Sequence, residues 1–185
     1  MGVLWAYSEA PGASADAPSR LPGGIDALRA NADDKLSLIM LVHPQCPCSR
    51  ASIAELSRVM GKVGDRVHAR VFFLRPEGEA EGWEVSDLWK SAEAIPGVVV
   101  TSDPNGEKAA AFGAKTSGQV VLYDAEGELL FEGGITSARG HEGDNDGESR
   151  IVSLAREKAH ASGEGAVHRS PVFGCGLFEE PRAER

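Results

Sequence analysis

The feature that most limits the possible folds is a short apolar run followed at once by two closely spaced cysteines. Residues 36–42 have the length and composition of a strand buried on both faces. The next eight residues read His43-Pro-Gln-Cys-Pro-Cys-Ser-Arg50, and a helical pattern of apolar residues begins after them. Thiols at such a junction lie at the positive end of the helix dipole, which favours thiolate over thiol. The segment therefore predicts a redox centre or a site for a soft metal.

The rest of the chain predicts alternating strands and helices, then a hairpin and a last helix. Further strands are expected at 67–74, from 98, and in a hairpin at 119–123 and 128–132; further helices are expected at 83–95, 104–112 and 148–161. Asn145 or Asp146 is a candidate N-cap for the last helix. This order predicts an α/β fold with a central mixed β-sheet flanked by helices.

Three segments are expected from the composition along the chain. Residues 25–161 hold all the regular elements and form one domain. Residues 1–24, rich in Ala, Pro, Gly and Ser after residue 7, are expected to be a flexible segment. Residues 162–185 form a tail, and its apolar stretch 171–178 is expected to dock on the domain and bring Cys175 towards the other cysteines.

The first seven residues leave the location open between two interpretations. Val3, Leu4, Trp5 and Tyr7 form a short apolar run that ends in aromatic residues, as a membrane span does where it meets water. On this interpretation the full-length protein is tethered to a membrane by a segment absent from this chain, and it works in the periplasm or another extracytoplasmic space. On the other, residues 1–7 are a loosely ordered terminus, and a cytoplasmic location stays open.

Charge and cysteine count exclude two classes of protein. The chain has 28 acidic and 19 basic residues, a net charge of −9, so no basic stripe is available to neutralise the phosphates of nucleic acid. Three cysteines cannot all pair within one monomer, which excludes a disulfide scaffold. A functional pair and one further thiol is the natural interpretation.

The cysteine pair and the order of elements resemble the thioredoxin superfamily over roughly residues 30–161. The second half resembles the TlpA-like and peroxiredoxin-like branches, in Ala111-Phe-Gly-Ala114, Thr116, Val120-Val-Leu-Tyr-Asp124 and Gly127-Glu-Leu-Leu-Phe131. The RedB-like group is more similar still, through the octapeptide at 43–50, Gly133-Gly-Ile-Thr136, Arg139-Gly-His141 and Gly143-Asp-Asn145. The resemblance implies a thioredoxin-like fold and a thiol–disulfide oxidoreductase whose partner is a protein thiol or disulfide, with no cofactor required.

The chain departs from thioredoxins at two places in the expected site. Thioredoxins carry Cys-x-x-Cys, whereas Cys46 and Cys48 are separated by Pro47 alone. Thioredoxins also place a cis-proline opposite the thiols, where this chain has Ser117 and Gly118. We expect these two residues to form the wall of the site, with the glycine allowing a close backbone approach. By analogy Cys46 is expected in an exposed loop and Cys48 within the helix, which favours Cys46 as the attacking thiol.

Metal binding is the alternative from a different class. Cys46, Cys48 and Cys175, or a histidine in place of the last, would suit Cu(I), which prefers soft ligands. Structural zinc usually takes two pairs of ligands, and no second pair is visible. The alternative function is therefore a Cu(I)-binding chaperone.

Histidines and the Gly-rich loop supply the remaining candidates. His43 is a candidate proton donor or shuttle near the thiols, or a histidine hydrogen-bonded at a strand end. Peroxiredoxins generally have threonine at the place of His43, so a thiol peroxidase is the weaker alternative. The loop after the hairpin should return to the cysteine end of the sheet. His141, Asp144 and Asn145 are therefore auxiliary candidates, or part of a solvated loop.

Overall fold

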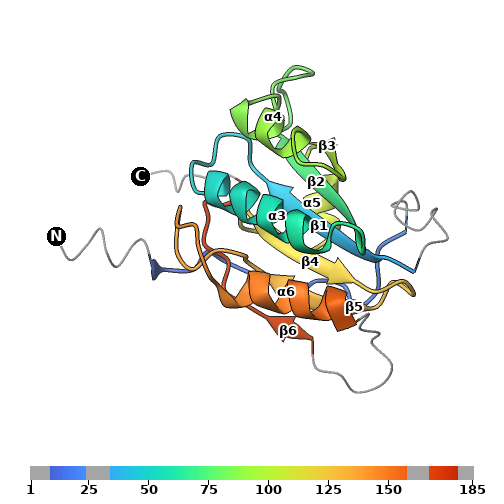
Figure 1. Cartoon of the computed structure of the whole chain (residues 1–185). Coiled ribbons are helices and arrows are strands. Elements are labelled where there is room, and N and C mark those ends of the chain that lie inside the picture. The colour runs from blue at the N-terminus through green and yellow to red at the C-terminus, as the bar shows by residue number, and fades with distance from the viewer. Residues whose placement is uncertain (1–8, 24–33, 158–166, 179–185) are drawn as a thin grey trace.

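A mixed six-stranded sheet forms the centre of the protein (Figure 1). The computed structural model describes residues 9–23, 34–157 and 167–178. The strands are β1 (Leu36–Val42), β2 (Val67–Arg75), β3 (Val98–Pro104), β4 (Gln119–Tyr123), β5 (Leu129–Gly133) and β6 (His168–Arg169). Their order across the sheet is β3-β2-β1-β4-β5-β6, and β4 is antiparallel to both β1 and β5 while the other neighbouring pairs are parallel. The predicted α/β fold with a mixed sheet is confirmed.

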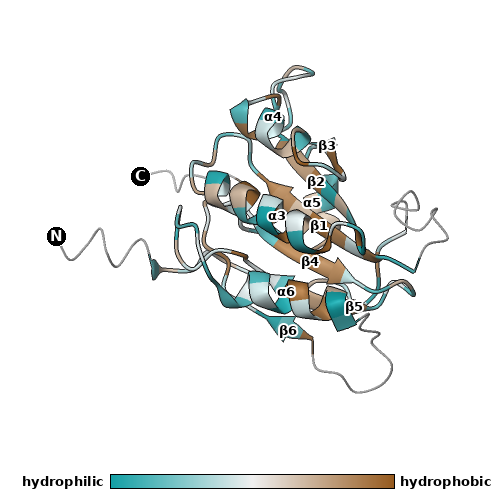
Figure 2. Ribbon diagram, in the orientation of Figure 1, coloured by the Kyte–Doolittle hydropathy of each residue, from teal (hydrophilic) through white to brown (hydrophobic). Residues whose placement is uncertain are grey.

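Helices cover both faces of the sheet, so its central strand is buried on both sides. The helices α3 (Ser49–Val63), α4 (Asp87–Glu93) and α6 (Asp146–Glu157) pack on one face, and α5 (Glu107–Ala111) lies on the other. In β1, Leu38 and Met40 face the three helices while Ile39 and Leu41 face α5. Figure 2 shows the apolar colour concentrated on the central strands and polar residues on the outer helix surfaces. A strand apolar at nearly every position is therefore required here.

Two helices are shorter than the sequence predicts, and local hydrogen bonds explain both. The helix expected from residue 83 begins only at Asp87, because the Ser86 side chain accepts the N–H of Trp89 at 3.4 Å and caps it. The helix expected from residue 104 begins at Glu107, because β3 continues through Pro104. The carboxylate of Asp103 accepts the N–H groups of the first turn of α5 at 2.7 and 2.9 Å.

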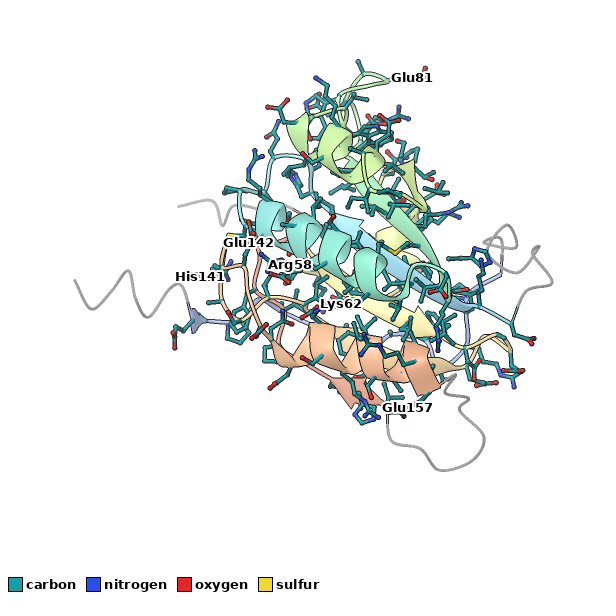
Figure 3. All side chains as sticks on the ribbon, in the orientation of Figure 1. Arg58, Lys62, Glu81, His141, Glu142 and Glu157 are labelled. Carbon is teal, nitrogen blue, oxygen red and sulfur yellow. The ribbon has the colours of Figure 1, made fainter. Side chains whose placement is uncertain are left out.

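The last helix begins earlier than expected, at Asp146, and the structure describes it as far as Glu157. Asn145 caps it, since its Oδ1 accepts the N–H of Glu148 at 2.8 Å. Residues 158–161, expected to be helical, lie outside the described residues. Ion pairs tie α6 and the preceding loop to α3, through Lys62–Glu148 at 2.6 Å and Arg58–Glu142 at 3.2 Å (Figure 3).

The described parts of the two terminal segments lie against the domain and against each other. Ala17 and Leu21, in a stretch expected to be flexible, are buried, and the backbone of Leu21 donates to Gly127 at 2.7 Å. The N–H of Gly12 donates to Val172 O at 2.8 Å, which joins the N-terminal segment to the tail. The tail adds β6 beside β5, a strand that the sequence did not predict. In the part of the chain that the structure describes, no helix is long and apolar enough to cross a membrane.

Candidate functional site: a cluster of three thiols

The two closely spaced cysteines lie in the turn between β1 and α3. Cys46 donates its N–H to His43 O at 3.1 Å, and its own carbonyl accepts the N–H of Ser49 at 3.2 Å. Helix α3 begins at Ser49 with Cys48 as its N-cap residue, so Cys48 does not lie within the helix as expected. Pro47 immediately precedes the N-cap and contributes its carbonyl to the same turn. Both thiols therefore stand at the positive end of a 15-residue helix.

Ser117 and Gly118 lie directly against this turn. The hydroxyl of Ser117 accepts the N–H of His43 at 2.8 Å and shares a 2.7 Å hydrogen bond with Ser49 Oγ. Gly118 donates its N–H to Leu41 O at 2.8 Å. Its φ is +90°, and a Cβ at this position would lie 2.6 Å from Ser52 Oγ. The chain thus has a serine–glycine wall where the sequence places it, and only glycine satisfies the backbone and the space there.

The tail crosses this wall as an extended segment and brings the third cysteine to the other two. Thr116 and Gly176 form an antiparallel bridge. Ser117 donates its N–H to Cys175 O and Leu177 donates to Lys115 O, both at 2.8 Å. This register places the N–H of Cys175 3.4 Å from the sulfur of Cys46. The sulfurs of Cys46, Cys48 and Cys175 all lie within 4.8 Å of one another, and all three thiols are free.

The exposure of the cysteines differs from the expectation that Cys46 lies in an exposed loop. Cys46 is only 2% exposed, whereas Cys48 and Cys175 are partly exposed. The preference for Cys46 as the nucleophile therefore cannot rest on an exposed loop. Cys46 does border a cavity of about 300 Å³ on the side of α4, together with Pro44 and Arg50. This cavity gives a reagent a route to Cys46 that does not require the tail to move.

Hydrogen bonds and charge distinguish the three thiols. Burial raises the pKa of Cys46, but hydrogen bonds from Ser49 and from Cys175 outweigh it, and the pKa falls below the ordinary value of 9.0. Burial and the neighbouring charge of Cys46 raise the pKa of Cys48, although Arg139 opposes them. Burial, the hydrogen bond to Cys46 and the nearby charges raise the pKa of Cys175 to about 12. Cys46 is therefore the most acidic of the three thiols.

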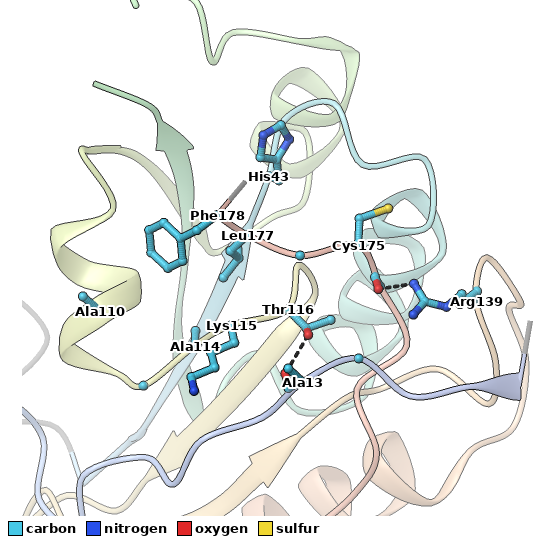
Figure 4. Close-up of a pocket in the computed structure, with 14 residues that line it drawn as sticks. Ala13, His43, Ala110, Ala114, Lys115, Thr116, Arg139, Cys175, Leu177 and Phe178 are labelled. Atoms are coloured by element: carbon cyan, nitrogen blue, oxygen red, sulfur yellow. Dashed lines mark hydrogen bonds between the residues drawn. The ribbon is translucent and has the colours of Figure 1, made fainter. Parts of the chain in front are cut away.

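The loop after the hairpin contributes Arg139 to the site, a residue that sequence reasoning did not select. Its side chain donates to Gly174 O, beside Cys175, and to Ala10 O at 3.2 Å (Figure 4). By contrast, His141 is exposed and bonds to Arg139 O at 2.9 Å, and Asn145 caps α6. Asp144 is also exposed. The loop does reach the cysteine end of the sheet, and its Arg139 holds the backbone beside Cys175 and opposes the rise in the pKa of Cys48.

His43 lies at the end of β1 beside the cluster. Its Nδ1 accepts the N–H of Gln45 at 3.2 Å, and its ring stands edge-on to Trp83 with centroids 5.9 Å apart. It also borders a cavity of about 780 Å³ on the α5 side of the tail, with Lys115, Thr116 and Phe178 (Figure 4). These contacts place His43 beside the site.

Ser49 is the second site residue that the sequence reasoning missed. Its signal was its position directly after Cys48, at the first residue of the predicted helix, where a hydroxyl can reach back into the turn. The signal for Arg139 was weaker, because the chain segment that it contacts comes from the distant tail.

Comparisons with known proteins establish the fold. No protein-family model matches the sequence, and no significant match occurs among curated proteins. Among solved structures, an uncharacterized conserved protein from Geobacillus kaustophilus is similar over 95% of both chains, with 18% identity and a TM-score of 0.62. The exposed lipoprotein thioredoxin of Streptococcus pneumoniae strain TIGR4 is similar over 70% of this chain and 89% of its own, with 17% identity and a TM-score of 0.51. A thioredoxin-like protein solved in the oxidized form matches over 81% of this chain and 96% of its own, with 15% identity and a TM-score of 0.51.

The chain has a thioredoxin-like fold. In it, the cysteine pair occupies the turn between the first described strand and α3, and the wall opposite is built by Ser117 and Gly118. The fold expected from the sequence is thereby confirmed. At sequence identities of 15–18%, these similarities show a shared fold but not a shared activity. The chemistry of the site must therefore be inferred from the three thiols and their surroundings.

Proposed function

We propose that the protein is a thiol–disulfide oxidoreductase that uses Cys46 and Cys48 as its redox pair. The observation that carries the proposal is the position of Cys46 at the N-terminus of α3, where hydrogen bonds lower the pKa of its thiol and the Cys48 sulfur lies within 4.8 Å. A thiolate is the nucleophile of disulfide exchange, and its formation is the step that the site favours. The thioredoxin-like fold is consistent with this chemistry.

The reaction follows from the difference between the two thiols. The Cys46 thiolate attacks one sulfur of a partner's disulfide; the new mixed disulfide forms and the partner's other sulfur leaves as a thiolate that takes a proton. Cys48, having lost its proton, then attacks Cys46, which releases the partner as a dithiol and leaves the Cys46–Cys48 disulfide. The partner disulfide gains two electrons and the protein pair loses two. Run backwards, the same steps oxidise a partner dithiol.

The proposal extends to the partner, the location and the branch of the superfamily. The partner is a protein thiol or disulfide, and the work is done outside the cytoplasm by a tethered form. This location is supported by the apolar, aromatic character of residues 3–7 and by the similarity to the exposed lipoprotein thioredoxin of Streptococcus pneumoniae. The TlpA and peroxiredoxin-like branch, closest to the RedB-like proteins, is supported by the sequence motifs quoted above.

Insulin reduction with dithiothreitol as electron source tests the proposal. The wild-type protein should accelerate insulin precipitation, and Cys46→Ser should return the rate to that without protein, because no thiolate remains to attack. The double variant Cys48→Ser/Cys175→Ser, reduced beforehand and mixed with insulin after dithiothreitol is removed, should trap mixed disulfides at Cys46. Glu81→Gln, at an exposed position labelled in Figure 3, is the control and should match the wild type. Full activity of Cys46→Ser would exclude the proposed role of this cysteine.

The three-sulfur cluster also supports a second candidate function, Cu(I) binding. Three sulfurs within 4.8 Å are a soft ligand set, and the lowered pKa of Cys46 eases the loss of its proton to a metal ion. The reduced protein should then bind one Cu(I) in an anaerobic titration against a competing chelator. Cys175→Ser should weaken the affinity at least about tenfold by removing a ligand. If copper binds no more tightly than to the Cys46→Ser/Cys48→Ser double variant, the copper function is excluded.

A further inference from the structure

We propose that Cys175 is an internal exchange partner for Cys46, so that the oxidised protein distributes its disulfide between Cys46–Cys48 and Cys46–Cys175. The tail segment 174–178, called the strap below, holds this third cysteine in place. The inference rests on the proposed thiol–disulfide function and adds to it a device by which the chain controls its own active cysteine.

Backbone hydrogen bonds hold the strap in a fixed register. It pairs with residues 115–117 as one strand pairs with another, through the hydrogen bonds of Ser117 to Cys175 and of Leu177 to Lys115. Because these bonds fix the register, the position of Cys175 does not depend on its own side chain. The backbone itself places this residue opposite Cys46.

Contacts on both sides of Cys175 along the chain anchor the strap. On the N-terminal side, Val172 is 3% exposed and bonds to Gly12, and the side chain of Arg139 donates to Gly174 O. On the C-terminal side, Leu177 is 1% exposed in the apolar cluster on the α5 face. A Cβ at Gly174 would lie 2.0 Å from Ser117 O. The close approach of the strap to the wall therefore needs this glycine.

The Cys175 sulfur lies near the Cys46–Cys48 pair but comes from a separate segment of the chain. An incoming thiol must approach one sulfur of a disulfide from outside the bonded pair. Cys175 comes from the strap, on a different chain segment from the turn that holds Cys46 and Cys48, and its sulfur lies within 4.8 Å of both. It is therefore close enough to reach the Cys46 sulfur from a segment outside the bonded turn.

The exchange step balances without an external reagent. In the oxidised protein Cys175 loses its proton and its sulfur attacks Cys46; the Cys46–Cys175 bond forms and the Cys46–Cys48 bond breaks. Cys48 leaves as a thiolate and takes up a proton. The number of disulfides and electrons is unchanged. The disulfide is first introduced by a partner disulfide, as in the proposed function.

The two disulfides have different consequences for the molecule. The Cys46–Cys48 bond lies within one turn and leaves the strap held by non-covalent contacts alone. The Cys46–Cys175 bond joins residues 129 positions apart, fastens the strap over Cys46 and leaves Cys48 as the free thiol. The second form closes the site against a partner that must reach Cys46 from the strap side.

Tryptic mapping of the oxidised protein separates the two disulfides. Cys46 and Cys48 share one tryptic peptide, residues 36–50, whereas Cys175 lies in residues 170–182. The full chain is oxidised with glutathione disulfide, remaining thiols are alkylated, and the peptides are identified by mass spectrometry. We expect both an internally oxidised 36–50 peptide and a crosslink between the two peptides. The crosslink should persist in Cys48→Ser, and Cys46→Ser should lose most of it.

The variants distinguish failure of this inference from failure of the proposed function. If Cys175→Ser forms the Cys46–Cys48 disulfide but neither the wild type nor Cys48→Ser gives the crosslink, the inference is wrong and the redox pair stands. If Cys175→Ser forms no disulfide, the proposed function fails as well. A crosslink that persists in Cys46→Ser and disappears in Cys48→Ser would show that Cys175 pairs with Cys48 and not with Cys46. This result would overturn the inference.

A positioning test uses Arg139, which holds the strap without bearing a thiol. Arg139→Ala removes the donor to Gly174 O and should lower the ratio of crosslinked to internal disulfide at least about twofold. Arg139→Lys, which keeps a donor, should restore part of the ratio. An unchanged ratio in Arg139→Ala would show that this contact does not position Cys175.

Discussion

At the scale of single residues, Ser49 explains why one of three neighbouring thiols has a lowered pKa. Its side chain is the largest factor that lowers the pKa of Cys46, against the opposing effect of burial. It is held in place by Ser117, 2.7 Å away. We predict that Ser49→Ala raises the pKa of Cys46, because a buried thiolate loses a donor that stabilised its charge.

Ultraviolet absorbance of the thiolate, followed as a function of pH in the reduced protein, measures this shift. The control is Ser57→Ala on the exposed side of the same helix, which should leave the titration unchanged. The lowered pKa also links folding to pH: stability from the Cys46 thiolate is present above the unfolded pKa and is lost as pH falls through the folded one. Ser49→Ala should weaken that dependence. Equal titrations of Ser49→Ala and wild type would rule out Ser49 as the donor.

Gly118 sets the wall of the site by its backbone conformation. With φ at +90° and Ser52 Oγ 2.6 Å from a Cβ, alanine is strained in both respects. We predict that Gly118→Ala lowers the free energy of unfolding by about 1–3 kcal/mol. Urea denaturation measures it. Gly61→Ala, at an open position within α3, is the matched control and should be neutral or gain about 0.5–1 kcal/mol. Equal effects of the two changes would contradict the argument.

At the scale of elements, the sequence predicts best where side-chain periodicity decides the structure. Residues 36–42 could be assigned because every position of β1 is buried. The first residues of α4 and α5 could not, because they depend on local hydrogen bonds to Ser86 and Asp103 that do not alter the apolar pattern. The cysteine turn was placed correctly between strand and helix, but the burial of Cys46 depends on the distant tail and so was missed.

The start of α6 gives an element-scale prediction. Asn145, an auxiliary site candidate from the sequence, accepts the N–H of Glu148 at 2.8 Å. Asn145→Ala should therefore lower the free energy of unfolding by about 1 kcal/mol through loss of the cap. Asn145→Asp, which keeps an acceptor, should retain most of the stability. Thermal unfolding monitored by circular dichroism compares the three proteins, and an unchanged midpoint for Asn145→Ala would refute the capping role.

At the scale of the whole molecule, the site is assembled from segments far apart in the sequence. The turn after β1, the residues before β4, the loop after β5 and the tail all meet at the three thiols. The apolar residues around Cys175 allowed docking of the tail to be predicted. Its register against residues 115–117 could not be predicted, because it is fixed by backbone hydrogen bonds that carry no side-chain signature.

Leu177 connects the stability of the whole domain to access at Cys46. It is 1% exposed in the cluster on the α5 face, two residues beyond Cys175. Leu177→Ala should lower the free energy of unfolding by about 2–5 kcal/mol. It should also loosen the strap, so that iodoacetamide labels Cys46 faster in the reduced, folded protein. Val85→Ala, with the parent side chain 48% exposed, is the control and should change neither quantity.

The two readouts of Leu177→Ala separate packing from gating. A strap that only packs would give lower stability with an unchanged labelling rate of Cys46, measured on the 36–50 peptide under conditions where the variant remains folded. A strap that controls access gives both changes, and labelling rises more for Cys46 than for the already accessible Cys48. Because local opening needs less free energy than global unfolding, the labelling rate should respond well below the denaturation midpoint. Labelling that rises only in parallel with global unfolding would show that the strap and the domain open as one unit.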